Sequence, residues 1–228
     1  GKQHDGESQD DADRDSDAFF SVQCVPLRGR VSFKRQYSCP CYIRPMIELI
    51  LGGARSGKSA LAERRAIESG LAVTYIATGE AGDNEMAARI AHHKTRRPIH
   101  WGLVEEPMHL AAALRAHAAP DRLLLVDCLT LWLSNLLFKG KAAQQAEAGE
   151  TIDCPLLRDE TQALIDCLPQ LPGRVILVSN EVGLGIIPMG ATTRLYVDEA
   201  GRLNQRIAQV CERVTFVAAG LPLELKTG

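Results

Sequence analysis

One eight-residue segment constrains the fold of this 228-residue chain more than any other. It matches G-x-x-x-x-G-K-[ST] in full and consists of Gly52, Gly53, Ala54, Arg55, Ser56, Gly57, Lys58 and Ser59. In this pattern the glycines let backbone N–H groups surround a polyanion with no Cβ in the way, and the lysine adds positive charge at the outer phosphates. The serine hydroxyl is a ligand for Mg²⁺, which bridges phosphate oxygens. The segment, called the P-loop below, therefore predicts a site for nucleotide phosphates.

The residues on either side of the P-loop agree with this interpretation. Ile47–Leu51 is a short apolar run typical of a buried strand, and the residues from Ser59 onward have the composition of a helix. A phosphate bound between them would lie at the positive end of the helix dipole.

Apolar runs alternate with amphipathic segments along the chain after Met46. The runs are Ile47–Leu51, Ala72–Ala77, Leu123–Val126, Arg174–Val178 and Val214–Ala218. The amphipathic segments are Ala60–Ser69, Asn84–Arg96, Met108–His117, Leu156–Leu168 and Arg194–Glu212. Strands that are apolar throughout and alternate with helices predict an α/β domain with a mainly parallel sheet covered by helices on both faces. Lys139–Asp153 interrupts the alternation and is expected to be a surface insertion.

Composition limits the classes of partner. The net charge of −2 gives no sign of binding to nucleic acid or to a membrane surface, and no apolar run approaches the 18 residues of a membrane span. The seven cysteines are irregularly spaced, so no disulfide framework is predicted. Cys128, Cys167 and Cys211 are expected to be reduced and buried, and the expected compartment is cytoplasmic.

The first 45 residues differ in composition from the rest. They begin acidic, turn basic after residue 22, and have no sustained helical or strand period. We expect an N-terminal extension that is disordered, or residues that precede a native start at Met46, and a single domain over residues 46–228. Cys24, Cys39 and Cys41 lack the spacing and the fourth ligand of a zinc site.

An acidic residue at the end of a strand completes the expected nucleotide site. Leu123–Val126 is followed at once by Asp127, in the position where a P-loop protein places the carboxylate that organises Mg²⁺. The guanine-reading motif Asn-Lys-x-Asp of regulatory GTPases is absent, and aromatic residues make up only 5% of the chain, which disfavours a nucleic-acid motor. A small-molecule kinase or transferase is the leading class, and a non-catalytic nucleotide-binding module remains open.

A basic segment with two histidines is the least usual part of the sequence. The spacing of Met86, Ile90 and His93 places them on one stripe of a helix, among the cations Arg89, Lys94, Arg96 and Arg97. Neighbouring cations keep an imidazole neutral and nucleophilic, and they could also neutralise a phosphate under attack. A solvated basic helix face with two ordinary histidines explains the same residues, so chemistry alone leaves both interpretations open.

Several motifs in one order resemble the bifunctional adenosylcobinamide kinase / adenosylcobinamide-phosphate guanylyltransferase family. They run from Met46 to the C-terminus and comprise the P-loop, Tyr75-Ile-Ala-Thr78, Asp83-x-Glu85-Met86, Arg89-Ile90-x-x-His93-Lys94, Arg97-Pro98-x-x-Trp101, Asp127-Cys-Leu-Thr130, Asn135-Leu136-Leu137, Ser179-Asn180-Glu181-Val182-Gly183-x-Gly185-Ile186 and Gly201-x-x-Asn204-Gln205. The resemblance implies two reactions: a nucleoside triphosphate, ATP or GTP, phosphorylates adenosylcobinamide, and GTP then donates GMP to give adenosylcobinamide-GDP and pyrophosphate.

The same resemblance implies roles for individual residues. The guanylyl carrier of the family matches His93, while His92 falls at a variable position. Further nucleotide contacts are implied for Thr78, Gly79, Glu80, Lys94, Thr95, Arg96, Arg97, Glu105 and Asp127, and Mg²⁺ ligands for Ser59 and Asp127. The implied fold is a three-layer P-loop NTPase-like domain that assembles as a homotrimer.

Two short segments depart from the family pattern. Met189-Gly190 stands where the family often has Glu-Asn, and Tyr196-Val197 stands where it often has Phe-Arg. If this region touches the corrinoid or a neighbouring subunit, those contacts differ here.

Overall fold

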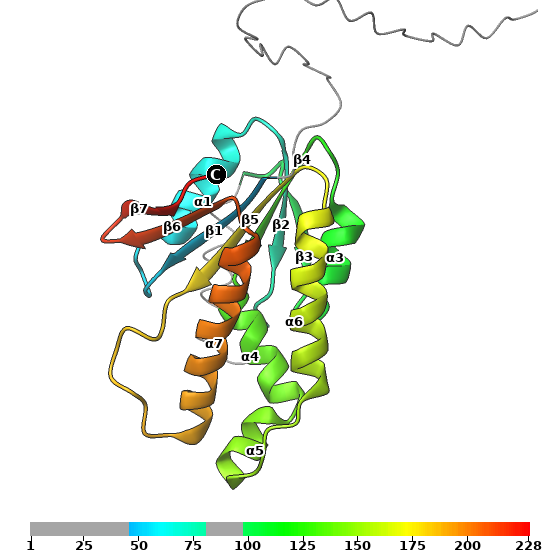
Figure 1. Cartoon of the computed structure of the whole chain (residues 1–228). Coiled ribbons are helices and arrows are strands. Elements are labelled where there is room, and N and C mark those ends of the chain that lie inside the picture. The colour runs from blue at the N-terminus through cyan, green and yellow to red at the C-terminus, as the bar shows by residue number, and fades with distance from the viewer. Residues whose placement is uncertain (1–45, 81–97) are drawn as a thin grey trace, which may run out of the picture. The chain divides into compact units, whose positions relative to one another are not determined.

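A computed structural model describes residues 46–80 and 98–228 and contains one seven-stranded sheet (Figure 1). The strand order is β3-β2-β4-β5-β1-β6-β7. The strands are β1 (Met46–Gly52), β2 (Ala72–Ala77), β3 (Gly102–Glu105), β4 (Arg122–Asp127), β5 (Arg174–Asn180), β6 (Arg213–Ala218) and β7 (Leu221–Lys226). All neighbouring pairs are parallel except β6 with β7. The predicted parallel sheet is confirmed, with an antiparallel strand added at one edge.

Helices cover both faces of this sheet. They are α1 (Lys58–Glu68), α3 (Leu110–His117), α4 (Leu129–Lys139), α5 (Ala142–Ala148), α6 (Pro155–Cys167) and α7 (Ala191–Val210), with a short 3₁₀ helix at Leu168–Gln170. The α1 helix packs on the face that carries Ile50, Leu125 and Ile176. The other long helices pack on the opposite face, which carries Leu49, Val126 and Leu177. Successive strand residues alternate between the two cores, which explains why the central strands are apolar throughout.

Four elements differ from the sequence expectations. Strands β3 and β7 were not predicted, nor was α4, whose Leu129, Trp132 and Leu136 are fully buried. The expected surface insertion over residues 139–153 is wrong in part, because α5 lies within it and buries Ala142 and Ala143. Small alanine side chains let this polar-looking helix pack closely beside α4 and α7.

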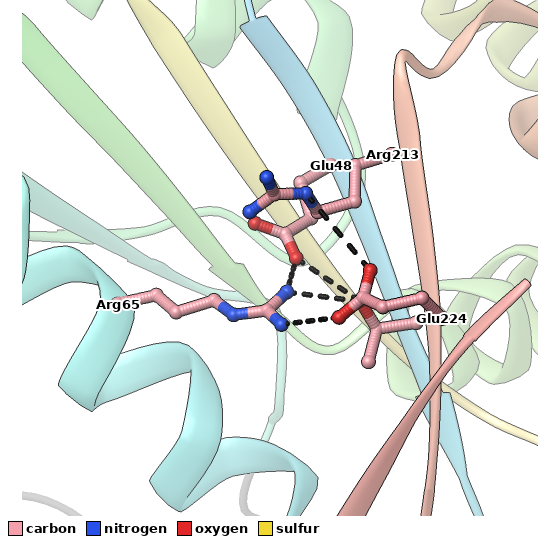
Figure 2. Close-up of polar contacts among 5 residues, drawn as sticks. Glu48, Arg65, Arg213 and Glu224 are labelled. Carbon is pink, nitrogen blue, oxygen red and sulfur yellow. Dashed lines mark hydrogen bonds and ion pairs between the residues drawn. The ribbon is translucent and has the colours of Figure 1, made fainter. Parts of the chain in front are cut away.

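An ionic cluster links α1 to the strands β1, β6 and β7 (Figure 2). The side chain of Arg65 in α1 forms an ion pair with the buried Glu48 of β1, and its Nη2 lies 2.7 Å from Oε1 of Glu224 in β7. Its Nη1 also donates to Thr215 Oγ1 of β6 at 2.9 Å. Only 4% of the Glu48 side chain is exposed, so Arg65 is the group that makes burial of this carboxylate tolerable.

Two expectations from composition can be compared with the described residues. Within that part of the chain, no helix combines the length and apolar character needed to cross a membrane. Cys128, Cys167 and Cys211 are buried and free, as predicted, and so is Cys154. The N-terminal extension and its three cysteines lie outside the described residues.

Candidate nucleotide-binding and catalytic site

The P-loop joins the end of β1 to the start of α1, as its sequence predicts. Gly57 precedes the first residue of α1 and has a φ of 97°, a conformation that favours glycine, and Arg55 has a φ of 56°. The Gly53 carbonyl accepts a hydrogen bond from the Ser56 N–H at 3.2 Å, which closes the turn. The loop therefore lies at the amino end of an 11-residue helix, where unpaired N–H groups and the helix dipole favour an anion.

The β6–β7 turn supports the P-loop from the side. The N–H of Gly220 donates to the Ser56 carbonyl at 2.8 Å. A Cβ added at Gly52 would lie 2.5 Å from the Val217 carbonyl oxygen of β6, closer than real Cβ contacts come. The first glycine of the motif is thus required by packing against β6.

Polar side chains of the P-loop remain available to a ligand. Lys58 is almost fully buried, and its Nζ donates to the Gly53 carbonyl at 3.2 Å, so the ammonium group is held inside the loop. The Ser56 hydroxyl is buried and has no hydrogen-bond partner in the described part of the chain. A buried polar group without a partner costs about 1–3 kcal/mol, and a ligand oxygen or a water would remove that cost. Ser59 lies half-buried in the first turn of α1.

Asp127 ends β4 at the same edge of the sheet. The register pairs Gly52 with Asn180 and Val178 with Asp127, so only β5 separates this carboxylate from the P-loop strand. Two strand spacings correspond to roughly 10 Å. The hydroxyl of the buried Tyr75 donates to Asp127 Oδ2 at 2.9 Å, which orients the carboxylate. Asp127 and Ser59 both offer oxygen ligands, the kind that Mg²⁺ prefers.

Thr78 holds the chain that follows Asp127. Its side chain is fully buried; its hydroxyl donates to the Cys128 carbonyl at 2.7 Å and accepts from the Cys128 N–H at 3.0 Å. Asn135 Nδ2 donates to the Thr78 carbonyl at 2.9 Å. The Thr78 side chain thus holds the backbone of Cys128, next to Asp127, and the nucleotide contact that the resemblance implies at Thr78 stays a prediction.

Cys128 follows Asp127 directly but is not a candidate nucleophile. Burial, and next the neighbouring Asp127 carboxylate, raise the pKa of its thiol to about 11. The thiol therefore stays protonated near neutral pH, and a protonated thiol is a poor nucleophile.

Two polar residues at the end of β5 lie between the P-loop and Asp127 and were not among the predicted site residues. Asn180 Nδ2 donates to Thr130 Oγ1 at 2.8 Å, and the Glu181 N–H donates to the Gly52 carbonyl at 3.1 Å. The position of a polar pair directly after an apolar strand was a signal available in the sequence, since parallel strands bring their carboxyl ends to one edge.

The remaining predicted residues divide into two groups. Gly79 and Glu80 follow β2 and Glu105 ends β3, so all three lie along the edge where β4 ends. Glu80 forms an ion pair of 2.6 Å with Lys139. His93, Lys94, Thr95, Arg96 and Arg97 lie outside the described residues.

A family model described as cobinamide kinase / cobinamide phosphate guanyltransferase matches residues 48–225. The chain belongs to this family. Membership makes it a bifunctional transferase and removes the non-catalytic binding module from consideration.

The chain matches its curated relatives over nearly their whole length. The chain is 60% identical over 181 residues to the bifunctional adenosylcobalamin biosynthesis protein CobP of Pseudomonas aeruginosa. The aligned residues make up 79% of this chain and 98% of that protein. It is 42% identical to CobU of Salmonella typhimurium and 40% identical to CobU of Escherichia coli, each over 182 residues, 79% of this chain and all of the relative.

A solved structure described as a prototypical ATPase from the type III secretion system of pathogenic bacteria matches 78% of this chain and 56% of that chain. Its TM-score is 0.48 and its sequence identity is 11%. The fold assignment therefore rests on the strand order of this chain and not on that likeness.

Proposed function

We propose that this cobinamide kinase-family enzyme uses the P-loop to phosphorylate adenosylcobinamide with ATP or GTP, and His93 to transfer GMP from GTP to that phosphate. The observation that carries the proposal is the preformed P-loop, with Lys58 held inside it and Asp127 across β5 from it. The curated relatives carry a name from adenosylcobalamin biosynthesis, which supports the corrinoid as the acceptor.

In the kinase reaction the aminopropanol hydroxyl oxygen of adenosylcobinamide attacks the γ-phosphorus. The new P–O bond forms as the bond between the γ-phosphorus and the β-phosphate oxygen breaks, the nucleoside diphosphate leaves, and the hydroxyl proton passes to solvent. Lys58 and the P-loop N–H groups stabilise the charge on the transferring phosphoryl group. Ser59 and Asp127 would hold Mg²⁺, which supplies further charge neutralisation when bound.

In the guanylyl reaction an imidazole nitrogen of His93 attacks the α-phosphorus of GTP, and pyrophosphate leaves. A phosphate oxygen of adenosylcobinamide phosphate then attacks the same phosphorus, the P–N bond breaks, and the free histidine returns. Covalent catalysis of this kind divides one difficult transfer into two easier steps. The neighbouring cations Lys94, Arg96 and Arg97 favour a neutral imidazole and attract the triphosphate.

The proposed cellular setting follows the family. We place the enzyme in the cytoplasm as a homotrimer that binds neither nucleic acid nor a membrane. Sedimentation equilibrium on the full chain tests the trimer.

The kinase assignment is tested by Lys58→Ala with Lys226→Ala as its control. Removing one electrostatic stabiliser of a transition state costs roughly 100-fold or more in rate, so Lys58→Ala should lose cobinamide phosphorylation to that extent. Lys226 is another cation, but it donates to the Ala208 and Gln209 carbonyls at the end of α7, and its replacement should leave the rate unchanged. Near-normal phosphorylation by Lys58→Ala would refute the assignment.

A further inference from the structure

The loop between β5 and α7 exposes an unusual amount of apolar surface. Over residues 182–190, called the apolar loop below, four large side chains are almost fully exposed: Leu184 (81%), Ile186 (97%), Ile187 (78%) and Met189 (94%). The same stretch contains no charged residue. Single exposed apolar residues are ordinary, but four within six positions indicate a surface that binds something.

Hydrogen bonds fix both ends of the apolar loop. At its start, Glu181 donates its N–H to the Gly52 carbonyl at 3.1 Å and accepts from the Gly183 N–H at 2.6 Å. At its end, Arg194 of α7 donates to the Pro188 carbonyl at 3.2 Å and also to that of Met189. Thr192 is bound in turn to the Ala143 carbonyl of α5 at 3.0 Å. Both ends of the loop are therefore attached to the rest of the domain, and Val182 at its start packs against the core.

The position of the apolar loop relates it to the acceptor substrate. It leaves the sheet at the end of β5, beside the strand that leads into the P-loop (Figure 1). The acceptor must bring one hydroxyl to the γ-phosphate at the P-loop, while its corrin ring is too bulky to enter a loop that closes on phosphates. The ring must therefore lie on surface next to the P-loop. A corrin ring presents apolar faces with methyl groups and uncharged amide side chains, which matches an uncharged apolar loop.

We propose that the apolar loop binds the corrin ring of adenosylcobinamide through Leu184, Ile186, Ile187 and Met189. This inference rests on the proposed function, because it takes the corrinoid as the acceptor. The loop supplies acceptor affinity and has no part in nucleotide binding. It also gives a physical role to Met189, where the sequence departs from the family pattern by replacing a carboxylate with a larger apolar side chain.

The test uses Ile186→Ser, Ile187→Ser and the double variant of the full chain. Equilibrium dialysis measures the Kd for adenosylcobinamide, and steady-state kinase assays measure the KM for adenosylcobinamide and for ATP. Burying an isoleucine side chain stabilises a complex enough to change affinity about tenfold or more, so each single variant should raise the corrinoid Kd and KM about tenfold. The KM for ATP should not change. Ile67→Ser is the control, because Ile67 is 59% exposed on α1 and serine has a similar helix propensity.

Three outcomes separate the possible failures. An unchanged corrinoid Kd in the double variant would overturn the inference. So would a change in sedimentation of the double variant, because it would mean that a second copy of the chain covers the apolar loop. If the wild type bound adenosylcobinamide without phosphorylating it, the proposed kinase function would fail, and the Kd of the loop variants would still decide the inference.

Discussion

At the scale of single residues, close packing explains why the P-loop begins with glycine. A Cβ at Gly52 would meet the Val217 carbonyl and the Ser56 hydroxyl, each at 2.5 Å, whereas a Cβ at Gly53 would meet nothing within 4 Å. We expect Gly52→Ala to lower the free energy of unfolding by about 1–3 kcal/mol, as overpacking does, and Gly53→Ala to change it by less than about 0.5 kcal/mol. Urea unfolding of both variants checks this, and equal losses would contradict the packing.

Also at the residue scale, the Tyr75 hydroxyl orients the Asp127 carboxylate. Tyr75→Phe keeps the ring in the core but removes the 2.9 Å hydrogen bond. We propose Asp127 as a Mg²⁺ ligand, and losing a group that orients a metal ligand costs roughly 10–100-fold in metal affinity or activity, so the Mg²⁺ concentration for half-maximal kinase activity should rise by that factor. The readout is a Mg²⁺ titration at saturating ATP. A lower rate with an unchanged Mg²⁺ midpoint would mean that the hydroxyl only stabilises the fold.

At the scale of elements, the ionic cluster of Figure 2 joins α1 to the sheet. Arg65→Met leaves the Glu48 carboxylate buried without its cation, and we expect the free energy of unfolding to fall by about 3 kcal/mol or more. Replacing Glu48 by Met as well should recover much of the loss, because no charge then remains buried. Arg213→Met is the control: its Nε lies 3.9 Å from Glu224 at an exposed position, so its loss should cost less than about 1 kcal/mol. Similar unfolding curves for the Arg65 and Arg213 variants would be inconsistent with this account.

The central strands could be predicted from the sequence, and the edges of the sheet could not. A strand that is buried on both faces has an apolar side chain at nearly every position. This pattern predicts the strands β1, β2, β4, β5 and β6. The residues of β3 are mostly exposed and begin with Gly102, so no run marks the strand. In β7 the leucines alternate with Pro222, Glu224 and Lys226 after the turn at Ala219-Gly220, a pattern typical of the second strand of a hairpin.

The parts of the candidate site that belong to a recognisable sequence motif could be predicted from the sequence. The P-loop and Asp127 each follow an apolar strand, and the parallel sheet brings them to one edge. The contacts that hold them come from distant positions: Gly220 at the P-loop, and Tyr75 and Thr78 at the end of β4. Such contacts depend on strand order, which local sequence patterns do not contain.

At the scale of the whole molecule, residues 1–45 are predicted to be dispensable. The family model begins at residue 48 and the described sheet begins at Met46. An acidic and then basic segment without a sustained helical or strand period contributes little to a core. Deleting residues 1–45 should leave the melting temperature and both activities unchanged. Thermal melts and the two assays on the shortened chain measure this, and a clear drop in melting temperature would show that the segment packs on the domain.

At the scale of the whole molecule, the family combines kinase and guanylyl transfer, and we propose that the second reaction proceeds through His93. Wild type, His93→Ala and His92→Ala are incubated with α-labelled GTP, denatured, and examined for label on the protein. We predict acid-labile, base-stable label on the wild type and His92→Ala that transfers to adenosylcobinamide phosphate when that acceptor is added before denaturation. His93→Ala should carry no label yet still phosphorylate adenosylcobinamide. Label that persists in His93→Ala would contradict the guanylyl-histidine mechanism at this residue.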